Sequence, residues 1–277
     1  MRFAVLGSPV SHSLSPAIQS AAFAATGIDA VYEARELSAA DLPSALPALH
    51  TEGFAGLNLT APLKEAVWPL LAGATPEASL LRSVNTLKRM EQGWEGHATD
   101  GLGFAAWARE VSLPVSGARV LLLGSGGAAR AVAPTLAALG ASAVTVVSRN
   151  ASRAASVTAL GERQNGGTAW SAASLDADRV ADEEGEFNLL VRSLSLSELA
   201  AGESAWWERL ADAAPVVDLN YGTRAGTIRR AARDAGRPFH DGLGMLLHQG
   251  ALSFTYWTGR EAPLDAMRRA LKEAAPG

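Results

Sequence analysis

The stretch Val120-Leu-Leu-Leu123-Gly124-Ser125-Gly126-Gly127-Ala128-Ala129 decides the fold. Its four apolar residues predict a buried strand, and the alanine-rich segment after the glycines predicts a helix that ends at Gly140. A glycine loop between strand and helix is typical of a dinucleotide site. Gly124 permits the tight turn, Gly126 lets the backbone approach a pyrophosphate, and the small Ala129 lets the helix pack on the strand. The predicted phosphate contacts, mainly free N–H groups, are Gly124, Ser125, Gly126, Gly127 and Ala128; the alternative is a tight structural turn with no ligand.

The residues after the next predicted strand, 141–147, indicate which dinucleotide binds. An NAD site usually has an acidic residue there that bonds the ribose 2′-hydroxyl, and this chain has none. Instead the predicted cofactor contacts Ser148, Arg149 and Asn150 follow the strand, with Arg153 close behind. Two guanidinium groups suit a 2′-phosphate dianion, which favours NADP over NAD. The alternative is that both arginines are exposed residues at a helix start with no ligand.

Strand-like and helix-like patterns alternate on both sides of this stretch. That alternation predicts an α/β fold with two domains: an N-terminal α/β domain with a mostly parallel sheet, and a Rossmann-type dinucleotide-binding domain. Ser15 is predicted to cap the first helix, with Pro16 at its first position. The predicted strands lie at 3–6, 30–36, 56–59, 83–87, 93–95, 120–123, 141–147, 187–191 and 215–219, and the main predicted helices at 15–26, 39–49, 101–111, 245–257 and 263–273.

Composition excludes several classes of protein. The 277 residues suggest two domains, and 48% hydrophobic with 19% charged residues indicates a globular chain. The absence of cysteine excludes disulfides and thiolate chemistry, and no metal site is expected. A net charge of −4 argues against nucleic-acid binding. No apolar run reaches the roughly 18 residues of a membrane span, and the start lacks the apolar stretch of a signal peptide, so a cytoplasmic protein is expected.

Five further motifs occur in order along the chain: Gly7–Pro16, Asn58–Lys64, Ser83–Thr86, Thr99–Gly101 and Asp241–Phe254. With the glycine loop in its place between them, this set resembles the shikimate dehydrogenase family. The resemblance implies reduction of 3-dehydroshikimate to shikimate with NADPH. It also implies a substrate-binding domain of residues 1–101 plus 238–277 and an NADP-binding domain of residues 102–237.

The resemblance implies a substrate site of mostly uncharged side chains. Ser13 and Ser15, at a helix N-terminus, would bind the substrate carboxylate without an arginine; the alternative is that Ser15 only caps the helix and Ser13 is idle. Tyr221 would lie near substrate and nicotinamide, or be a strand-end aromatic. The residues implied to bind ring hydroxyls, each on its own a plausible turn or cap residue, are Asn58, Thr60, Asn85 and Gln249.

Lys64 and Asp100 are the implied catalytic pair, and both would also contact substrate. Lysine is scarce, at three of 24 basic residues, and an ammonium can stabilise an alkoxide and give up a proton. Asp100 would bond a neighbouring substrate hydroxyl. The alternatives are a first-turn surface lysine and a helix-capping aspartate, because sequence alone does not show that the two meet. His12, between the turn and the serines, is expected to be a structural hydrogen-bonding residue in preference to a catalytic base.

The chain departs from the family pattern mainly in the cofactor half. Ala98 lies two residues before Asp100, where the family commonly has asparagine. Ser148 lies directly before Arg149, where the family usually has asparagine as well. The stretch Arg192-Ser-Leu-Ser195 replaces Asn-Ala-Thr-Ser, so a cofactor-contacting loop is rebuilt and carries an extra cation. The segment after Tyr221 lacks the family's proline. Because it adds a cation to a cofactor-contacting loop, Arg192 is the second candidate for binding the 2′-phosphate, after Arg149. Two more cofactor contacts implied by the family are Leu219 and Gly242.

Two competing functions stay open. One is a relative that prefers quinate or NAD, which the pair Lys64 and Asp100 would serve equally. The other is a non-catalytic NADP(H)-binding regulator, against which the joint presence of that pair and Gln249 argues. The expected partners are the small-molecule substrate and NADP, with neither nucleic acid nor membrane, in a monomer or homodimer.

Overall fold

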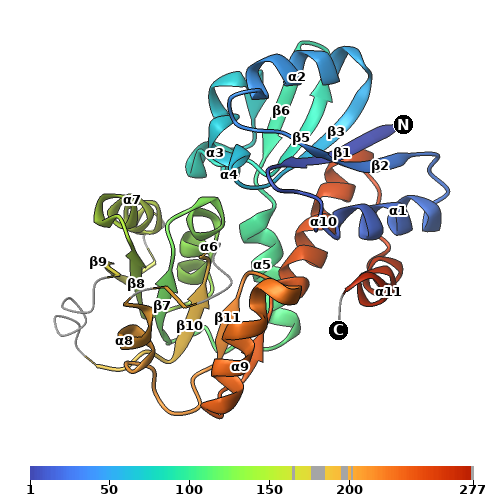
Figure 1. Cartoon of the computed structure of the whole chain (residues 1–277). Helices are drawn as coiled ribbons and strands as arrows, with labels where there is room; N and C mark the ends of the chain where they lie inside the picture. The colour runs from blue at the N-terminus through green and yellow to red at the C-terminus, as the bar shows by residue number, and fades with distance from the viewer. Residues whose placement is uncertain (164–165, 176–184, 195–198, 201, 276–277) are drawn as a thin grey trace. The chain divides into compact units, whose positions relative to one another are not determined.

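The computed structural model describes residues 1–163, 166–175, 185–194, 199–200 and 202–275. Its internal contacts divide the chain into two compact units, Met1–Gly103 with Leu246–Ala275, and Phe104–Met245. Each unit has its own sheet, and the predicted α/β fold is confirmed (Figure 1). Which unit binds substrate and which binds the dinucleotide stays a prediction. None of the described helices is long and apolar enough to cross a membrane.

The first unit is built on a six-stranded sheet of order β2-β1-β3-β5-β6-β4. β1 runs parallel to β2 and β3, and β4 parallel to β6, whereas β5 is antiparallel to β3 and β6. The β5–β6 pair is antiparallel because the two strands form a tight hairpin that closes on the Met90–Gly93 pair. The strands are β1 (Arg2–Gly7), β2 (Val31–Glu36), β3 (Phe54–Leu59), β4 (Gly73–Ala74), β5 (Thr86–Met90) and β6 (Gly93–His97).

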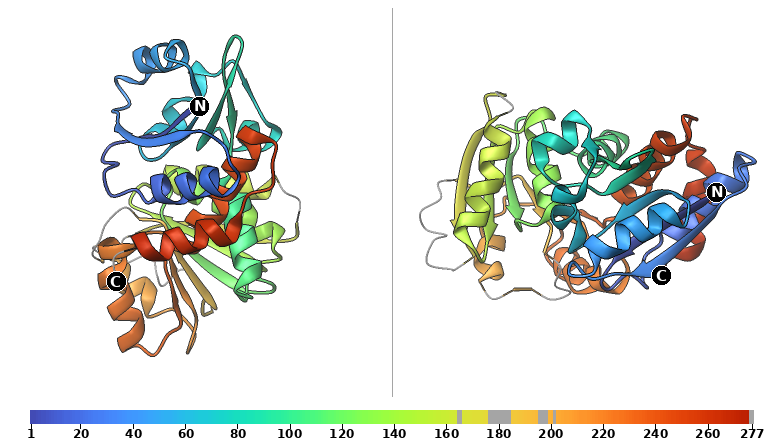
Figure 2. Two further views of the ribbon diagram at one scale, coloured as in Figure 1. Left: turned by 90° about the vertical axis from the view of Figure 1, so that its right-hand side faces the viewer. Right: turned by 90° about the horizontal axis from the view of Figure 1, so that it is seen from above.

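Aromatic side chains join the sheet of the first unit to its helices. Phe3 of β1 stacks on Phe23 of α1, and Trp257 of α10 lies 4.9 Å from Phe3 between ring centroids. α10 packs tightly on the sheet, because a Cβ at Gly56 would lie 2.4 Å from the Trp257 indole nitrogen. α1 and α11 lie side by side (Figure 2). The helices that belong wholly or in part to this unit are α1 (Ser15–Ala25), α2 (Leu42–Thr51), α3 (Leu63–Ala66), η1 (Trp68–Leu70), α4 (Pro76–Leu81), α5 (Asp100–Glu110), α10 (Leu243–Thr258) and α11 (Leu264–Ala274).

The second unit contains a six-stranded, all-parallel sheet of order β12-β11-β10-β7-β8-β9. This is the strand order of the Rossmann fold. Along central β7, Val120 and Leu122 enter one apolar cluster and Leu121 and Leu123 another, so both faces of the sheet are covered. Its elements are β7 (Arg119–Leu123), α6 (Gly127–Ala138), β8 (Ala143–Ser148), α7 (Ala151–Glu162), β9 (Ala169–Ser174), β10 (Leu189–Arg192), α8 (Glu203–Trp207), β11 (Val216–Asp218), η3 (Gly222–Ala225), α9 (Gly226–Asp234) and β12 (Phe239–His240).

Candidate active site

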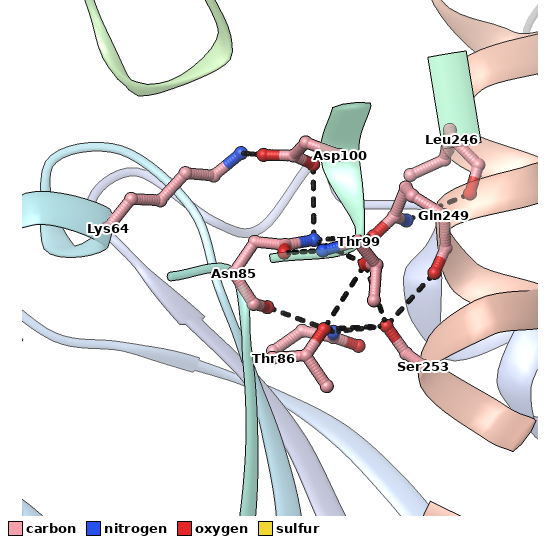
Figure 3. A network of polar contacts seen from close by, with 9 residues as sticks. Lys64, Asn85, Thr86, Thr99, Asp100, Leu246, Gln249 and Ser253 are labelled. Atoms are coloured by element: carbon pink, nitrogen blue, oxygen red, sulfur yellow. Dashed lines mark hydrogen bonds and ion pairs between the residues drawn. The ribbon is translucent and has the colours of Figure 1, made fainter. Parts of the chain in front are cut away.

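Lys64 and Asp100 meet in the first unit. Lys64 extends from the short helix α3, and Asp100 is the first residue of α5. Lys64 Nζ lies 2.5 Å from Asp100 Oδ2, and the two side chains are only 17% and 8% exposed (Figure 3). The capping alternative for Asp100 is not what the geometry shows, because both its carboxylate oxygens bond side chains from other elements.

Asn85, just before β5, fixes the orientation of Asp100. Its Nδ2 reaches Asp100 Oδ1 at 3.1 Å and Gln249 Oε1 at 3.1 Å, while its Oδ1 accepts a 2.7 Å hydrogen bond from the Thr99 backbone N–H. The backbone donor shows which end of the amide is the oxygen, so the amide nitrogen must face Asp100. Asp100 Oδ1 is thereby held by Asn85 and Oδ2 is left for Lys64 (Figure 3).

Gln249, on α10, brings a distant part of the chain into this network. Its Nε2 donates to the Leu246 carbonyl at 2.8 Å, which leaves Oε1 to accept from Asn85. α10 reaches this position because Gly103 of α5 has no side chain: a Cβ there would lie 2.5 Å from the Gln249 backbone nitrogen.

Asn58, at the end of β3, is committed to protein partners. Its Nδ2 lies 3.0–3.1 Å from three acceptors, and its Oδ1 accepts a 2.7 Å bond from the Tyr32 hydroxyl. An amide nitrogen has two hydrogens, so these contacts leave no donor to spare for a ligand. The three acceptors are the Asn85 carbonyl, Thr86 Oγ1 and Ser253 Oγ.

Four residues of this network were not among the predicted site residues: Tyr32, Thr86, Thr99 and Ser253. Burial raises the pKa of the Tyr32 hydroxyl well above its usual value, so it stays a neutral donor to Asn58. The other three lie inside the motifs that carry the resemblance, which was the available signal. Tyr32 lies in none of them, and nothing in the sequence marked it.

At the start of α1, the structure differs from the prediction that Ser15 caps the helix. The helix begins at Ser15 itself, and Leu14 at the cap position has no side-chain bond. The hydroxyl that accepts a helix N–H is that of Ser13, at 3.3 Å from the Ser15 nitrogen. Ser15 itself is buried, at 5% exposed. Ser15 as the N-cap was therefore wrong, because the cap depends on local backbone angles that the residue types leave open.

Thr60 and His12 lie at the edges of this group. Thr60 follows β3, and its methyl carbon would lie 2.2 Å from a Cβ on Gly7, so β1 needs glycine at that point. His12 is exposed in the turn before α1. Their predicted roles stay predictions.

The glycine loop of the second unit has the geometry that a dinucleotide requires. Gly124 has φ of +119°, and a Cβ there would lie 2.8 Å from Ser193 Oγ. Gly126 caps α6, and a Cβ there would point into open space, so the backbone is accessible from that side. The loop therefore fits a pyrophosphate lying against the start of α6.

Arg149 directly follows β8 and Arg153 lies in the first turn of α7, and both are exposed. Arg153 Nη2 lies 3.5 Å from the Ser125 carbonyl, so this guanidinium lies over the glycine loop. Asn150 caps α7 by accepting from the Arg153 N–H at 3.1 Å, and Ser148 bonds the Asn150 carbonyl at 2.7 Å. These two side chains shape the turn that presents the arginines.

Arg192 is not the available cation that the altered loop suggested. Its side chain is fully buried, with Nε 2.7 Å from Glu203 Oε1 and Nη1 3.4 Å from Asp218 Oδ2. A guanidinium held this way does not reach a 2′-phosphate, so the prediction of Arg192 as the second candidate for that phosphate was wrong. Ser195, in the same loop, lies outside the described residues.

Leu219 and Gly242 pack against each other in the second unit. A Cβ at Gly242 would lie 2.1 Å from the Leu219 carbonyl oxygen, and Gly242 N–H donates to the Asn220 carbonyl at 2.9 Å. Tyr221 follows directly, in the second unit, whereas the other predicted substrate residues belong to the first. Its place beside the substrate stays a prediction.

Together these features define a class of protein. A Rossmann-ordered sheet with an open glycine loop, and a partly buried lysine–aspartate pair among uncharged polar side chains, are those of a dinucleotide-dependent oxidoreductase. The family profile described as "Shikimate dehydrogenase substrate binding domain" matches residues 5–87, and "Shikimate 5'-dehydrogenase C-terminal domain" matches residues 242–272. The chain belongs to the shikimate dehydrogenase family, and the predicted resemblance is confirmed.

Individual relatives cover nearly the whole chain. "Shikimate dehydrogenase (NADP(+))" of Geobacter metallireducens is 38% identical over 270 residues, covering 96% of this chain and 93% of that protein. The shikimate 5-dehydrogenase of Thermus thermophilus, solved in complex with NADP(H) and shikimate, has a TM-score of 0.79 at 32% identity and 99% coverage of both chains. The ligand-free 5-ketofructose reductase of a Gluconobacter species has a TM-score of 0.77 at 28% identity, covering 99% of this chain and 98% of that one.

Proposed function

We propose that this chain reduces 3-dehydroshikimate to shikimate with NADPH. The observation that carries the proposal is the Lys64–Asp100 pair, 2.5 Å apart and held by Asn85 in a buried set of neutral polar side chains. A binding module has little use for such a pair. A ketone reductase needs it, because the carbonyl oxygen gains negative charge and then a proton.

The chemistry divides between the cofactor and these residues. Bound NADPH supplies the hydride. The Lys64 ammonium, as the only cation of the pair, stabilises the developing alkoxide and donates its proton to that oxygen. Asp100 holds the ammonium in place and accepts a hydrogen bond from the neighbouring substrate hydroxyl. Asn85 keeps the carboxylate from rotating, because it bonds Asp100 Oδ1.

The carboxylate of the substrate would bind at Ser13 and Ser15. The Ser13 hydroxyl lies beside the first N–H group of α1, and the positive end of that helix favours an anion. This feature separates 3-dehydroshikimate from an uncharged keto-sugar such as 5-ketofructose, which has no carboxylate to place there. We therefore favour the shikimate reaction over that of the ketofructose reductase relative.

For the cofactor, we assign the 2′-phosphate to Arg149 and Arg153 and the pyrophosphate to the loop Gly124–Ala128. Both arginines are exposed where a Rossmann fold binds the adenosine ribose, and no acidic residue follows β8 to favour NAD. We place the enzyme in the cytoplasm, where NADPH is supplied, as a monomer or homodimer without a nucleic-acid partner. Size-exclusion chromatography with light scattering tests the oligomeric state.

The experiment is an assay of the purified chain that follows the absorbance of the reduced cofactor, with shikimate or quinate crossed with NADP or NAD. We expect shikimate with NADP to give the highest kcat/KM of the four combinations. A higher kcat/KM for quinate or for NAD would move the assignment to the quinate-type relative. Tight NADPH binding without turnover of any substrate would instead indicate the regulatory alternative.

A further inference from the structure

Three ionisable side chains form a fully buried cluster in the second unit: Arg192, Glu203 and Asp218. Arg192 ends β10 and lies opposite Asp218, which ends β11, in the parallel register, and Glu203 begins α8. Arg192 Nε lies 2.7 Å from Glu203 Oε1, its Nη2 lies 3.4 Å from Glu203 Oε2, and its Nη1 lies 3.4 Å from Asp218 Oδ2. We call these three residues the buried clasp.

The clasp is not explained by stability alone. One cation faces two carboxylates away from water, and removing charges from water costs much of what their attraction returns. Burial raises the pKa of Asp218 to about 6, which shows how poorly solvated that carboxyl is. Apolar residues would fill the same space without that cost, so the clasp calls for another role.

The clasp ties together three segments that follow the strands. Glu203 Oε2 accepts from the Ala200 N–H at 2.8 Å. Asp218 Oδ1 accepts from the Asn220 backbone N–H at 3.0 Å and from Asn220 Nδ2 at 2.8 Å. Asn220 Nδ2 also donates to the Leu194 carbonyl at 2.7 Å. Leu194 just after β10, the start of α8 and the turn after β11 are thus linked to one charged centre, Leu194 through Asn220.

These segments lie where the second half of a dinucleotide binds. In a Rossmann sheet the ligand lies at the carboxyl ends of the strands, and the strands on the β10–β11 side of β7 hold the half away from the adenosine. Asn220 is followed by Tyr221, and its carbonyl accepts from Gly242, which packs on Leu219. The clasp is therefore bonded to the segment that carries Tyr221, which the family resemblance places near the nicotinamide, and Leu219, an implied cofactor contact.

We propose that Arg192, Glu203 and Asp218 are positioning residues that hold the nicotinamide-side segments of the cofactor site. The proposal rests on the proposed use of NADPH. The clasp acts through Asn220 and the turn after β11 and does not touch the cofactor itself.

The test separates the two halves of the cofactor. The variant Arg192→Met/Glu203→Met removes both charges of the closest pair at once, so only the Asp218 carboxyl remains without its cation, and not the two carboxyls that Arg192→Met alone would leave. Calorimetry measures its binding of NADPH and of 2′,5′-ADP, a fragment that carries the adenosine and 2′-phosphate but no nicotinamide. We expect NADPH affinity and kcat to fall about tenfold or more, while 2′,5′-ADP affinity stays within about twofold.

Three further variants make the result decisive. Asn220→Ala removes the link between Asp218 and Leu194 and leaves the three charges in place. We expect it to weaken NADPH binding, by less than the double variant does, and to leave 2′,5′-ADP binding unchanged. This variant replaces the double variant in the test if the double variant does not fold. Arg237→Met is the matched control. Its guanidinium bonds the backbone carbonyls of Ala211 and Leu210, before β11 begins, and neither ligand's affinity should change. Arg149→Ala should weaken both ligands together.

Folded clasp variants with unchanged NADPH affinity and kcat would overturn the proposal, as would an equal loss for NADPH and 2′,5′-ADP. A wild-type chain that binds neither ligand would instead overturn the proposed function. The two failures are therefore distinguishable.

Discussion

Replacing Asp100 by asparagine tests whether the catalytic pair acts as a unit. The two carboxylate oxygens accept from two groups that only donate at this place, the Lys64 ammonium and the Asn85 amide nitrogen. Asparagine has one oxygen and one NH2 group, so one of the two partners must face a donor. The variant loses the ion pair and leaves the Lys64 ammonium, 17% exposed, without its counter-charge.

The expected size of the loss follows from those contacts. A hydrogen bond to a charged group contributes about 1.5–3 kcal/mol, which corresponds to about tenfold to a hundredfold in rate if it is lost from the transition state. Lys64→Ala removes the proton donor and the alkoxide's cation together, so we expect kcat to fall by about 10³-fold or more. If Asp100 acts through Lys64, the double variant loses hardly more than Lys64→Ala alone.

The assay is kcat for NADPH formation from shikimate at saturating NADP, for the wild type, both single variants and the double variant. Lys88→Ala is the matched control, since its ammonium donates to the Tyr256 carbonyl away from the pair and kcat should be unchanged. Thermal unfolding checks that each variant folds. Losses that multiply, giving about 10⁴- to 10⁵-fold in the double variant, would refute the argument that the two residues act together.

Three more results are expected. Arg149→Ala should raise KM for NADP about tenfold to a hundredfold and leave KM for NAD nearly unchanged, because one charge-assisted bond to the 2′-phosphate is lost; an unchanged NADP/NAD ratio of KM values refutes this site. Gly103→Ala should lower the free energy of unfolding by about 1–3 kcal/mol in urea titrations, because its Cβ would lie 2.5 Å from the Gln249 backbone nitrogen, whereas Gly73→Ala, with nothing within 4 Å, should not. Burial raises the pKa of folded Asp218 from 3.8 to about 6, so between those pH values the folded chain keeps a proton that the unfolded chain releases. The unfolding free energy of the wild type, compared with that of Asp218→Asn, should therefore fall by about 3 kcal/mol as pH rises through this window. Above the window the difference should stay constant. Parallel urea titrations of both proteins between about pH 4 and 7 measure this difference, and a constant difference contradicts it.

Much of the fold follows from the sequence because local pattern and burial agree in it. The apolar run of β7 with the glycine loop after it predicts the start of a Rossmann sheet, and both faces of that strand are covered. The ends of elements are less predictable: the strand expected from residue 83 begins at Thr86, because Val84 and Asn85 precede the hairpin that pairs β5 with β6. Strand ends depend on pairing partners, which are distant in the chain.

The site could be predicted only where a motif marks it. Lys64 and Asp100 were identified by motif, but their contact depends on how α3 and the start of α5 are placed, which no local pattern specifies. Tyr32 stands in no motif, yet it holds Asn58 through a single hydrogen bond.

The buried clasp shows a second limit of sequence reasoning. In the sequence, Arg192 stands out as an extra cation in an altered loop, which makes it a second candidate for the 2′-phosphate after Arg149. Its partners Glu203 and Asp218 come from a later helix and from the neighbouring strand. Only the register of β10 with β11 places Asp218 beside the arginine. Charge in a sequence is therefore not the same as charge available to a ligand.

The central claim is that the Lys64–Asp100 pair faces the reacting oxygen while Ser13 and Ser15, at the start of α1, hold the carboxylate. A crystal structure of the chain with shikimate bound tests it most directly. The account predicts that the carboxylate lies within hydrogen-bond distance of Ser13 and Ser15, and that the hydroxyl to be oxidised lies within that distance of Lys64 Nζ. Shikimate bound in the reverse orientation, with its carboxylate on Lys64, would contradict it.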